Sequence, residues 1–149
     1  SRASEGHGAL VTKVESQFLV ATDYSPALEV TSATPPRYFE LRTYTTNPGK
    51  LENLHTRFRD HTLRLFETHG MTNMLYWRPA GDQPGMENKM VYLLAFPGKP
   101  ARDAAWAAFV ADDAWKTVAA DSQKDGQILA ADGGIVSVEM EPTDYSPMK

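Results

Sequence analysis

Three of the four histidines lie in one stretch with helical spacing, where imidazoles could bind a metal or transfer protons: His55, His61 and His69. His61 follows Leu54 by seven positions and Phe58 by three, so a regular helix would turn it toward a sheet. Histidine there serves as a ligand, an acid or base, or an orienting group. The alternative is a half-buried, hydrogen-bonded residue at a helix–sheet junction. His55 lies about 600° of helical rotation before His61, so the two side chains point apart and no metal site is expected.

Charged and aromatic side chains alternate along residues 38–44, where Glu40, Arg42 and Tyr44 share one face of a predicted strand. A charge on a covered face must be paired, so the structural interpretation is an ion pair at a dimer interface. The functional interpretation places Arg42 and Tyr44 in a ligand pocket between a helix and the sheet. Tryptophans more often anchor a core or an interface than form a ligand platform. The candidate ligand-binding residues are His61, Arg42, Tyr44, Trp77 and Tyr92.

The composition excludes several classes of function. With 15 Lys and Arg against 19 Asp and Glu, the formal net charge is −4, and the chain lacks the basic stripe that nucleic-acid binding requires. The chain has no Cys, which excludes a disulfide framework, a thiolate nucleophile and Cys-ligated metal centres. The phosphate-loop, nucleophile-elbow and His-Glu-x-x-His signatures are also absent. We therefore expect no cofactor and identify no catalytic residue.

A repeated segment marks the organisation of the chain. Residues 14–26 align without gaps on residues 135–147; six of the 13 positions are identical, and five of these form Thr-Asp-Tyr-Ser-Pro in both copies. Each copy is a strand-like run followed by a turn, because Asp and Ser cap local backbone groups and Pro lacks the N–H that strand pairing needs. One interpretation is a chance pentapeptide in two unrelated turns. The other is a tandem repeat of one domain.

The tandem interpretation divides the chain into residues 1–36 and a complete domain at residues 37–149. Residues 9–26 would be the closing strand of a preceding copy, and residues 27–36 a linker. Because this strand belongs to a copy that is otherwise missing, residues 9–26 should pair with a sheet edge or dock across a partner subunit through Val14, Phe18 and Val20.

Within the second copy, periodicity predicts the order strand, helix, strand, strand, helix, strand. Leu54, Phe58 and Leu65 form the expected buried stripe of the first helix. Pro100 opens the second helix, and Asp112 is placed to cap a further helical piece. This order is typical of the α+β ferredoxin-like fold, whose antiparallel sheet carries its helices on one face. The predicted strands cover residues 38–44, 73–78, 89–96 and 135–140, and the first helix covers residues 51–69.

The other face of such a sheet needs a cover. Tyr38, Arg42 and Tyr44 are assigned to this uncovered face, where they are too large and partly apolar to remain in water. The expected solution is a homodimer or higher homo-oligomer whose interface includes Tyr38 or Tyr44 and residues of the third and fourth strands. Such an interface should bury at least about 1,000 Å².

Eight short strings, in this order and spacing, resemble those of the NIPSNAP family: Phe39-Glu40-Leu41-Arg42-Thr43-Tyr44, Pro48-Gly49-Lys50-Leu51, Phe58-Arg59-Asp60-His61-Thr62, His69-Gly70-Met71, Tyr76-Trp77, Tyr92-Leu93-Leu94-Ala95, Asp112-Asp113-Ala114-Trp115-Lys116 and Thr143-Asp144-Tyr145-Ser146-Pro147. The resemblance covers residues 38–147. The resemblance implies a ferredoxin-like domain that forms a dimeric α/β barrel. The NIPSNAP family also includes bacterial members with two tandem domains. One departure is Asp113, where the family often has Pro. The resemblance implies no settled reaction.

Two classes of function fit these observations. The first is a dimeric module that binds a partner protein or a small apolar or aromatic ligand. The second is an enzyme similar to the cofactor-independent or haem-linked monooxygenases of the dimeric α/β barrel architecture. This class rests on the analogy between folds alone. A closed pocket containing His61 would favour the enzyme, and a filled core there would favour the module. No apolar run approaches the roughly 20 residues of a membrane-spanning helix, so we expect a soluble protein, either in the bacterial cytoplasm or exported after signal removal.

Overall fold

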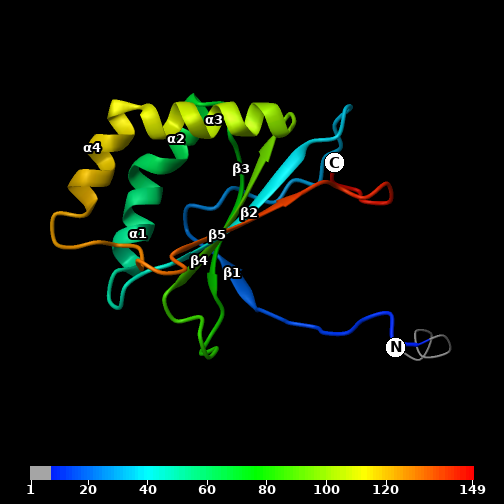
Figure 1. Ribbon diagram of the computed structural model, residues 1–149, viewed down its shortest axis with the longest axis horizontal. Coiled ribbons are helices and arrows are strands. Elements are labelled where there is room, and N and C mark those ends of the chain that lie inside the picture. The colour runs from blue at the N-terminus through cyan, green and yellow to red at the C-terminus, as the bar shows by residue number, and fades with distance from the viewer. Residues whose placement is uncertain (1–7) are drawn as a thin grey trace.

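The computed structural model describes residues 8–149 as an antiparallel sheet with its helices packed on one face (Figure 1). The α+β class predicted from periodicity is confirmed. The elements follow the order β1 (Leu19–Ala21), β2 (Tyr38–Thr45), α1 (Leu51–Arg57), η2 (Phe58–Thr62), α2 (Leu63–Thr68), β3 (Thr72–Pro79), β4 (Lys89–Phe96), α3 (Lys99–Ala111), α4 (Asp113–Ser122) and β5 (Ile135–Met140).

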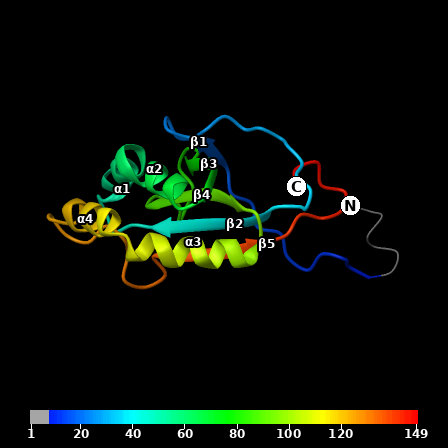
Figure 2. The same ribbon diagram turned by 90° about the horizontal axis from the view of Figure 1, so that it is seen from above.

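The five strands lie in the spatial order β1-β3-β4-β2-β5, and each neighbouring pair is antiparallel. β4 is the central strand, and it is buried along nearly its whole length because β3 and β2 flank it on both sides. β5 forms one edge and is mostly exposed. The short strand β1 extends the other edge beside β3 (Figure 2).

The helix-covered face of β2 is the opposite of the one expected. Its side chains are Tyr38, Glu40, Arg42 and Tyr44. Tyr44 is 6% exposed and packs edge-on against Phe58 of η2, with ring centroids 5.8 Å apart. Alternation along a strand determines which residues share a face but not which face is covered. That choice depends on α3, which supplies Arg102 and Trp106 as hydrogen-bond partners for the buried charge of β2.

The other face of the sheet, which we call the open face, carries a separate apolar cluster to which no described helix contributes. Its core residues come from β2, β3 and β4. The pairing of β2 with β5 extends the cluster to the sheet edge, because Val138 lies directly opposite Leu41 and Val136 opposite Thr43. At this edge Val136 is 52% and Val138 48% exposed. The members of the cluster are Phe39, Leu41, Met74, Leu75, Trp77, Leu93, Ala95, Met140 and Met148.

The predicted first helix is continuous in the chain, but one π-helical turn, η2, interrupts its regular spacing. Leu54 and Phe58 are buried as predicted, at 0% and 1% exposed. A π turn contains one additional residue and therefore rotates everything after it. Phe66 is buried, whereas the predicted Leu65 is only partly buried against the same core. His61 is exposed, so the expected direction of His61 toward the sheet is wrong.

Aromatic side chains fill the space between the helices and the sheet. Phe58 lies at the centre, with its ring 5.3 Å from that of Tyr92 and 6.0 Å from that of Phe66. Tyr76 stacks on Tyr92 with an interplanar angle of 11°. This is the position at which a pocket between helix and sheet would lie, and it is occupied by packed rings.

The second helical region begins and divides as predicted. Pro100 lies in the first turn of α3, where its missing N–H has no helical partner to lose. Asp112 separates α3 from α4, and its carboxylate accepts a hydrogen bond from Ala114 N at 2.8 Å. The same carboxylate lies 2.7 Å from His69 Nε2, which fixes the end of the first helical region against the second. None of the described helices is long and apolar enough to cross a membrane.

Candidate functional site

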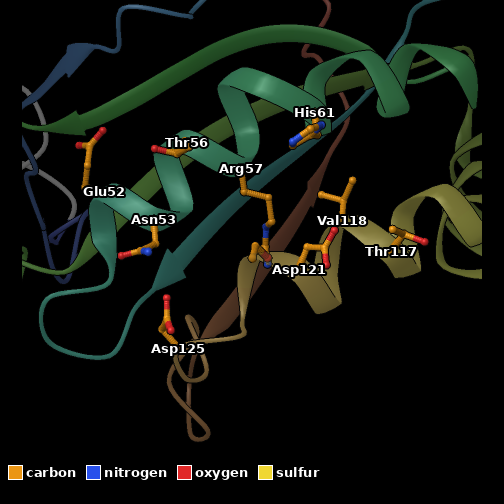
Figure 3. A pocket seen from close by; sticks show the side chains of 10 residues that line it. Glu52, Asn53, Thr56, Arg57, His61, Thr117, Val118, Asp121 and Asp125 are labelled. Carbon is orange, nitrogen blue, oxygen red and sulfur yellow. The ribbon is translucent and has the colours of Figure 1, made fainter.

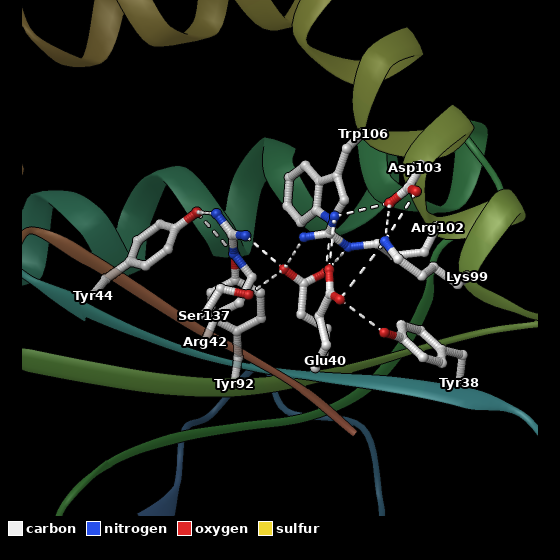
Figure 4. A network of polar contacts seen from close by, with 11 residues as sticks. Tyr38, Glu40, Arg42, Tyr44, Tyr92, Lys99, Arg102, Asp103, Trp106 and Ser137 are labelled. Carbon is white, nitrogen blue, oxygen red and sulfur yellow. Dashed lines mark hydrogen bonds and ion pairs between the residues drawn. The ribbon is translucent and has the colours of Figure 1, made fainter. Parts of the chain in front are cut away.

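The chemically densest part of the sheet is a buried polar network beneath α3, with Glu40 at its centre (Figure 4). The side chain of Glu40 is 0% exposed. Its carboxylate accepts five hydrogen bonds from four side chains: Arg42 Nη1 at 2.7 Å, Arg102 Nε at 2.9 Å and Nη2 at 2.8 Å, Trp106 Nε1 at 2.7 Å and Ser137 Oγ at 2.7 Å. These donors come from β2, α3 and β5, so the network joins three elements.

Arg42 connects this carboxylate to two buried phenols. Its Nε donates to Tyr92 Oη at 2.8 Å and its Nη2 to Tyr44 Oη at 3.1 Å, while Tyr92 donates to Tyr44 at 2.9 Å. The guanidinium carbon lies 4.2 Å from the ring centroid of Trp106, a cation–π distance. Burial raises the pKa of Tyr92, so its phenol stays protonated. Every member of this arm therefore has a protein partner.

Hydrogen bonding keeps Glu40 ionised despite its burial. Desolvation acts to raise its pKa, but the bonds from Arg102, Ser137, Trp106 and Arg42 together outweigh it and lower the pKa from 4.5 to about 2. A carboxylate with so low a pKa and five donors already attached is a poor proton acceptor. The arrangement stabilises the contact between sheet and α3 and leaves no vacant position for acid–base chemistry.

We expect this network to make the fold sensitive to acid. A carboxyl whose pKa is lower in the folded state stabilises that state above its unfolded pKa. The contribution of Glu40 should therefore be complete above about pH 4.5 and lost as the pH falls toward 2, amounting to at most roughly 3 kcal/mol. Urea unfolding at several pH values would measure it. In Glu40→Gln the dependence on pH over this range should be shallower, and identical slopes in the two proteins would contradict the assignment.

A groove of about 570 Å³ lies between the first helical region and α4 (Figure 3). Arg57, a residue that the sequence analysis did not single out, is its most distinctive group. The residue is 5% exposed, and its Nε has no hydrogen-bond partner among the described residues. Burial lowers the pKa of Arg57. The residues lining the groove are Glu52, Asn53, Thr56, Arg57, His61, Thr117, Val118, Asp121, Ser122 and Asp125.

Within this groove, Arg57 is held by weak contacts. Its Nη1 donates to Ser122 Oγ at 3.4 Å, and its guanidinium carbon lies 5.1 Å from the ring centroid of Trp115. The unpaired Nε of Arg57 is itself buried, and Asp121 and Asp125 make the rim of the groove acidic. The described residues contain no cluster of three His, Asp or Glu side chains that could hold a metal ion.

The five predicted ligand-binding residues occupy three separate places. Arg42, Tyr44 and Tyr92 lie together in the network beneath α3. His61 lines the groove, and Trp77 belongs to the open face. A single pocket does not contain them all.

Sequence reasoning missed Arg57 and Arg102, and each could be found from a partial signal. Arg57 immediately precedes the buried Phe58, and neighbouring helical residues lie only about 100° apart, so both can be buried on one broad face. Arg102 lies near the start of α3 and supplies the second cation that a buried Glu40 needs. Arg57 contacts α4 and Arg102 contacts β2, so neither pairing is visible without the tertiary packing of α3 and α4.

The sequence and the fold of this chain are both similar to those of known proteins. The chain matches the NIPSNAP family model over residues 39–147. It is similar to the crystal structure of a NIPSNAP family protein of unknown function from Agrobacterium tumefaciens, with 20% identity, a TM-score of 0.62, and coverage of 80% of this chain and 99% of that one. An uncharacterised NIPSNAP-like domain protein from Burkholderia xenovorans aligns with 16% identity and a TM-score of 0.61, covering 74% of this chain and 89% of that one.

At 16–20% sequence identity, the similarity to these solved structures shows a shared fold and nothing about a shared activity. No curated protein matches the chain. The family model, however, covers most of the chain, from the first residues of β2 to the second Thr-Asp-Tyr-Ser-Pro segment. The chain therefore belongs to the NIPSNAP family.

Proposed function

We propose that this chain is a non-catalytic assembly module that binds a second NIPSNAP domain through the open face of its sheet. The order β3-β4-β2-β5 with all helices on one face supports a ferredoxin-like domain. Two such sheets packed face to face would form a dimeric α/β barrel. This interface replaces the one expected from sequence, because Tyr38 and Tyr44 lie on the helix-covered face.

The observation that carries the proposal is the apolar character of the open face. Leu41, Leu75 and Trp77 remain partly exposed there, beside the half-exposed Val136 and Val138. A continuous apolar surface on a sheet is unfavourable in water and is a usual mark of an interaction site. A second copy of the same face would cover it symmetrically.

The filled interior supports a module over the alternative of a monooxygenase-like enzyme. Phe58, Phe66 and Tyr92 occupy the space between helices and sheet, where a substrate would have to lie. Arg42 and Tyr44, the polar groups proposed for that pocket, are bonded to neighbouring side chains. His61 lies outside this space, in the groove.

We expect Val138→Glu to dissociate the dimer. The added carboxylate would lie unpaired in an apolar interface, whereas in the monomer it would stay in water, because Val138 is 48% exposed on an edge strand. Sedimentation velocity at micromolar concentration should show a dimer for the parent chain and a dissociation constant raised at least about tenfold in the variant.

The matched control is Val110→Glu, which introduces the same charge at a valine that is 57% exposed on α3, on the helix side. This variant should remain dimeric. A parent chain that is monomeric at micromolar concentration, or equal effects of the two substitutions, would count against the open face as the interface. Circular dichroism confirms that each variant is folded.

A further inference from the structure

The first Thr-Asp-Tyr-Ser-Pro segment, residues 22–26, is docked on β3 through its backbone and a hydroxyl. Thr22 N donates to Tyr76 O at 2.9 Å, and Tyr76 N donates to Ser25 Oγ at 2.9 Å. The segment thus continues the pairing of β1 with β3 and then turns toward the first helix. Both polar groups of the Tyr76 backbone are bonded by this segment.

The side chains of the segment enter a site on the helix side of the sheet. Tyr24 Oη lies 2.7 Å from His55 Nδ1 and 3.1 Å from Met90 Sδ. Arg59 donates two hydrogen bonds to the carboxylate of Asp23, at 2.7 and 2.9 Å. Burial raises the pKa of Tyr24. We call this site the tyrosine socket; it is formed by His55, Arg59, Tyr76 and Met90.

The second segment, residues 143–147, has the same local shape but makes no such contacts with the described residues 8–149. Ser146 N donates to Thr143 O at 3.1 Å, as Ser25 N donates to Thr22 O at 3.3 Å in the first copy. Tyr145, which corresponds to the socketed tyrosine, is 84% exposed. Tyrosine is enriched at interfaces, and the same turn in the first copy places its tyrosine against the domain.

The chain that leads into the second segment also fits the edge of β3. Phe18 O accepts from Ala80 N, directly after β3, and Thr22 N donates to Tyr76 O of β3. By strand alternation the N–H of Ala21 therefore points away from β3. The residue that corresponds to Ala21 in the second copy is Pro142, which has no N–H. The missing N–H of Pro142 would therefore cost no hydrogen bond if the second segment paired with β3 as the first one does.

The second segment cannot reach the socket of its own domain. It follows β5, which forms one edge of the sheet, whereas the socket lies beside β3 near the opposite edge. The socket is also already filled by Tyr24. If the second segment occupies a tyrosine socket, that socket must therefore belong to another copy of the domain.

We propose that Thr143–Pro147 is a docking segment that binds the tyrosine socket of a second copy of this domain, with Tyr145 placed as Tyr24 is placed here. A preceding repeat, as proposed from the sequence, would supply that copy, and the two closing segments would then be exchanged reciprocally. This surface is distinct from the open face, so each proposal can fail without the other.

A peptide-binding measurement tests the proposal on the whole 149-residue chain. The probe is a fluorescent peptide of residues 138–149. The receptor is the Asp23→Ala, Tyr24→Ala, Ser25→Ala, Tyr145→Ala variant, which lacks the carboxylate, the ring and the hydroxyl that hold the first segment on Arg59, His55 and Tyr76, and whose own second segment lacks its tyrosine. Fluorescence anisotropy should show saturable binding. The same peptide with Tyr145→Ala should bind at least about tenfold more weakly, and adding Arg59→Ala to the receptor should weaken binding of the unmodified peptide.

If circular dichroism shows that this receptor does not fold, the receptor becomes the milder Asp23→Ala, Tyr24→Leu, Tyr145→Ala chain, in which a smaller side chain leaves His55 Nδ1 without the phenol. With either receptor, no saturable binding, or equal binding of the two peptides, overturns the proposal. Adding Val138→Glu to the receptor serves as the control. It should leave peptide binding unchanged, because β5 lies at the other edge of the sheet.

Discussion

Glu40→Gln should lower the free energy of unfolding by about 3 to 5 kcal/mol, because it leaves buried cations without their anion. Arg42 and Arg102 have side chains only 11% and 19% exposed, and both bond to this carboxylate. A glutamine amide keeps one acceptor oxygen but turns a donor toward other donors. Urea unfolding at pH 7 would measure the loss.

The control for this variant is Glu139→Gln, on the exposed side of the same network. Glu139 is 32% exposed and bonds to Arg102, Lys99 and Tyr38. Water can replace it there, so the expected loss is below about 1 kcal/mol. Equal losses for the two substitutions would show that burial does not decide the strength of this network.

Phe58→Ala should be as destabilising, at about 3 to 5 kcal/mol, because it opens a cavity at the centre of the aromatic core. The phenyl ring is 1% exposed, and its centroid lies within about 6 Å of four other aromatic rings. Substituting it removes packing on both the helix side and the sheet side. Thermal or urea unfolding measures the effect.

His61→Ala is the matched control for Phe58→Ala, since both residues belong to η2. His61 is exposed, so its replacement should change the free energy of unfolding by no more than about 0.5 kcal/mol. A loss of several kcal/mol for His61→Ala would mean that the π turn does not orient the two side chains as described.

The local pattern of the sequence was enough to predict those strands and helix ends that are determined by neighbouring residues in the chain. Strand alternation, the proline at the start of α3 and the aspartate between α3 and α4 each act within a few residues. The family could also be identified from short strings, because their order and spacing reflect the whole domain. The burial of Leu54 and Phe58 could be predicted because the helix is regular up to Arg57 and its π turn only begins at Phe58.

Tertiary structure decided what periodicity leaves open. Alternation along β2 grouped Tyr38, Arg42 and Tyr44 together, but only the packing of α3 turned that group toward the helices. The π turn is a departure of one residue, too small to be seen in a spacing pattern, yet it moved His61 from the sheet side into a groove.

The repeated Thr-Asp-Tyr-Ser-Pro shows the difference most clearly. The sequence by itself established that the two segments are the same, and it predicted that the first would pair with a sheet edge. Only the three-dimensional structure separated them, because Tyr24 has His55 and Met90 within reach while Tyr145 lies at the far edge of the sheet in water. Identical residues have different contacts here because a side chain's environment is set by distant segments, which local sequence does not encode.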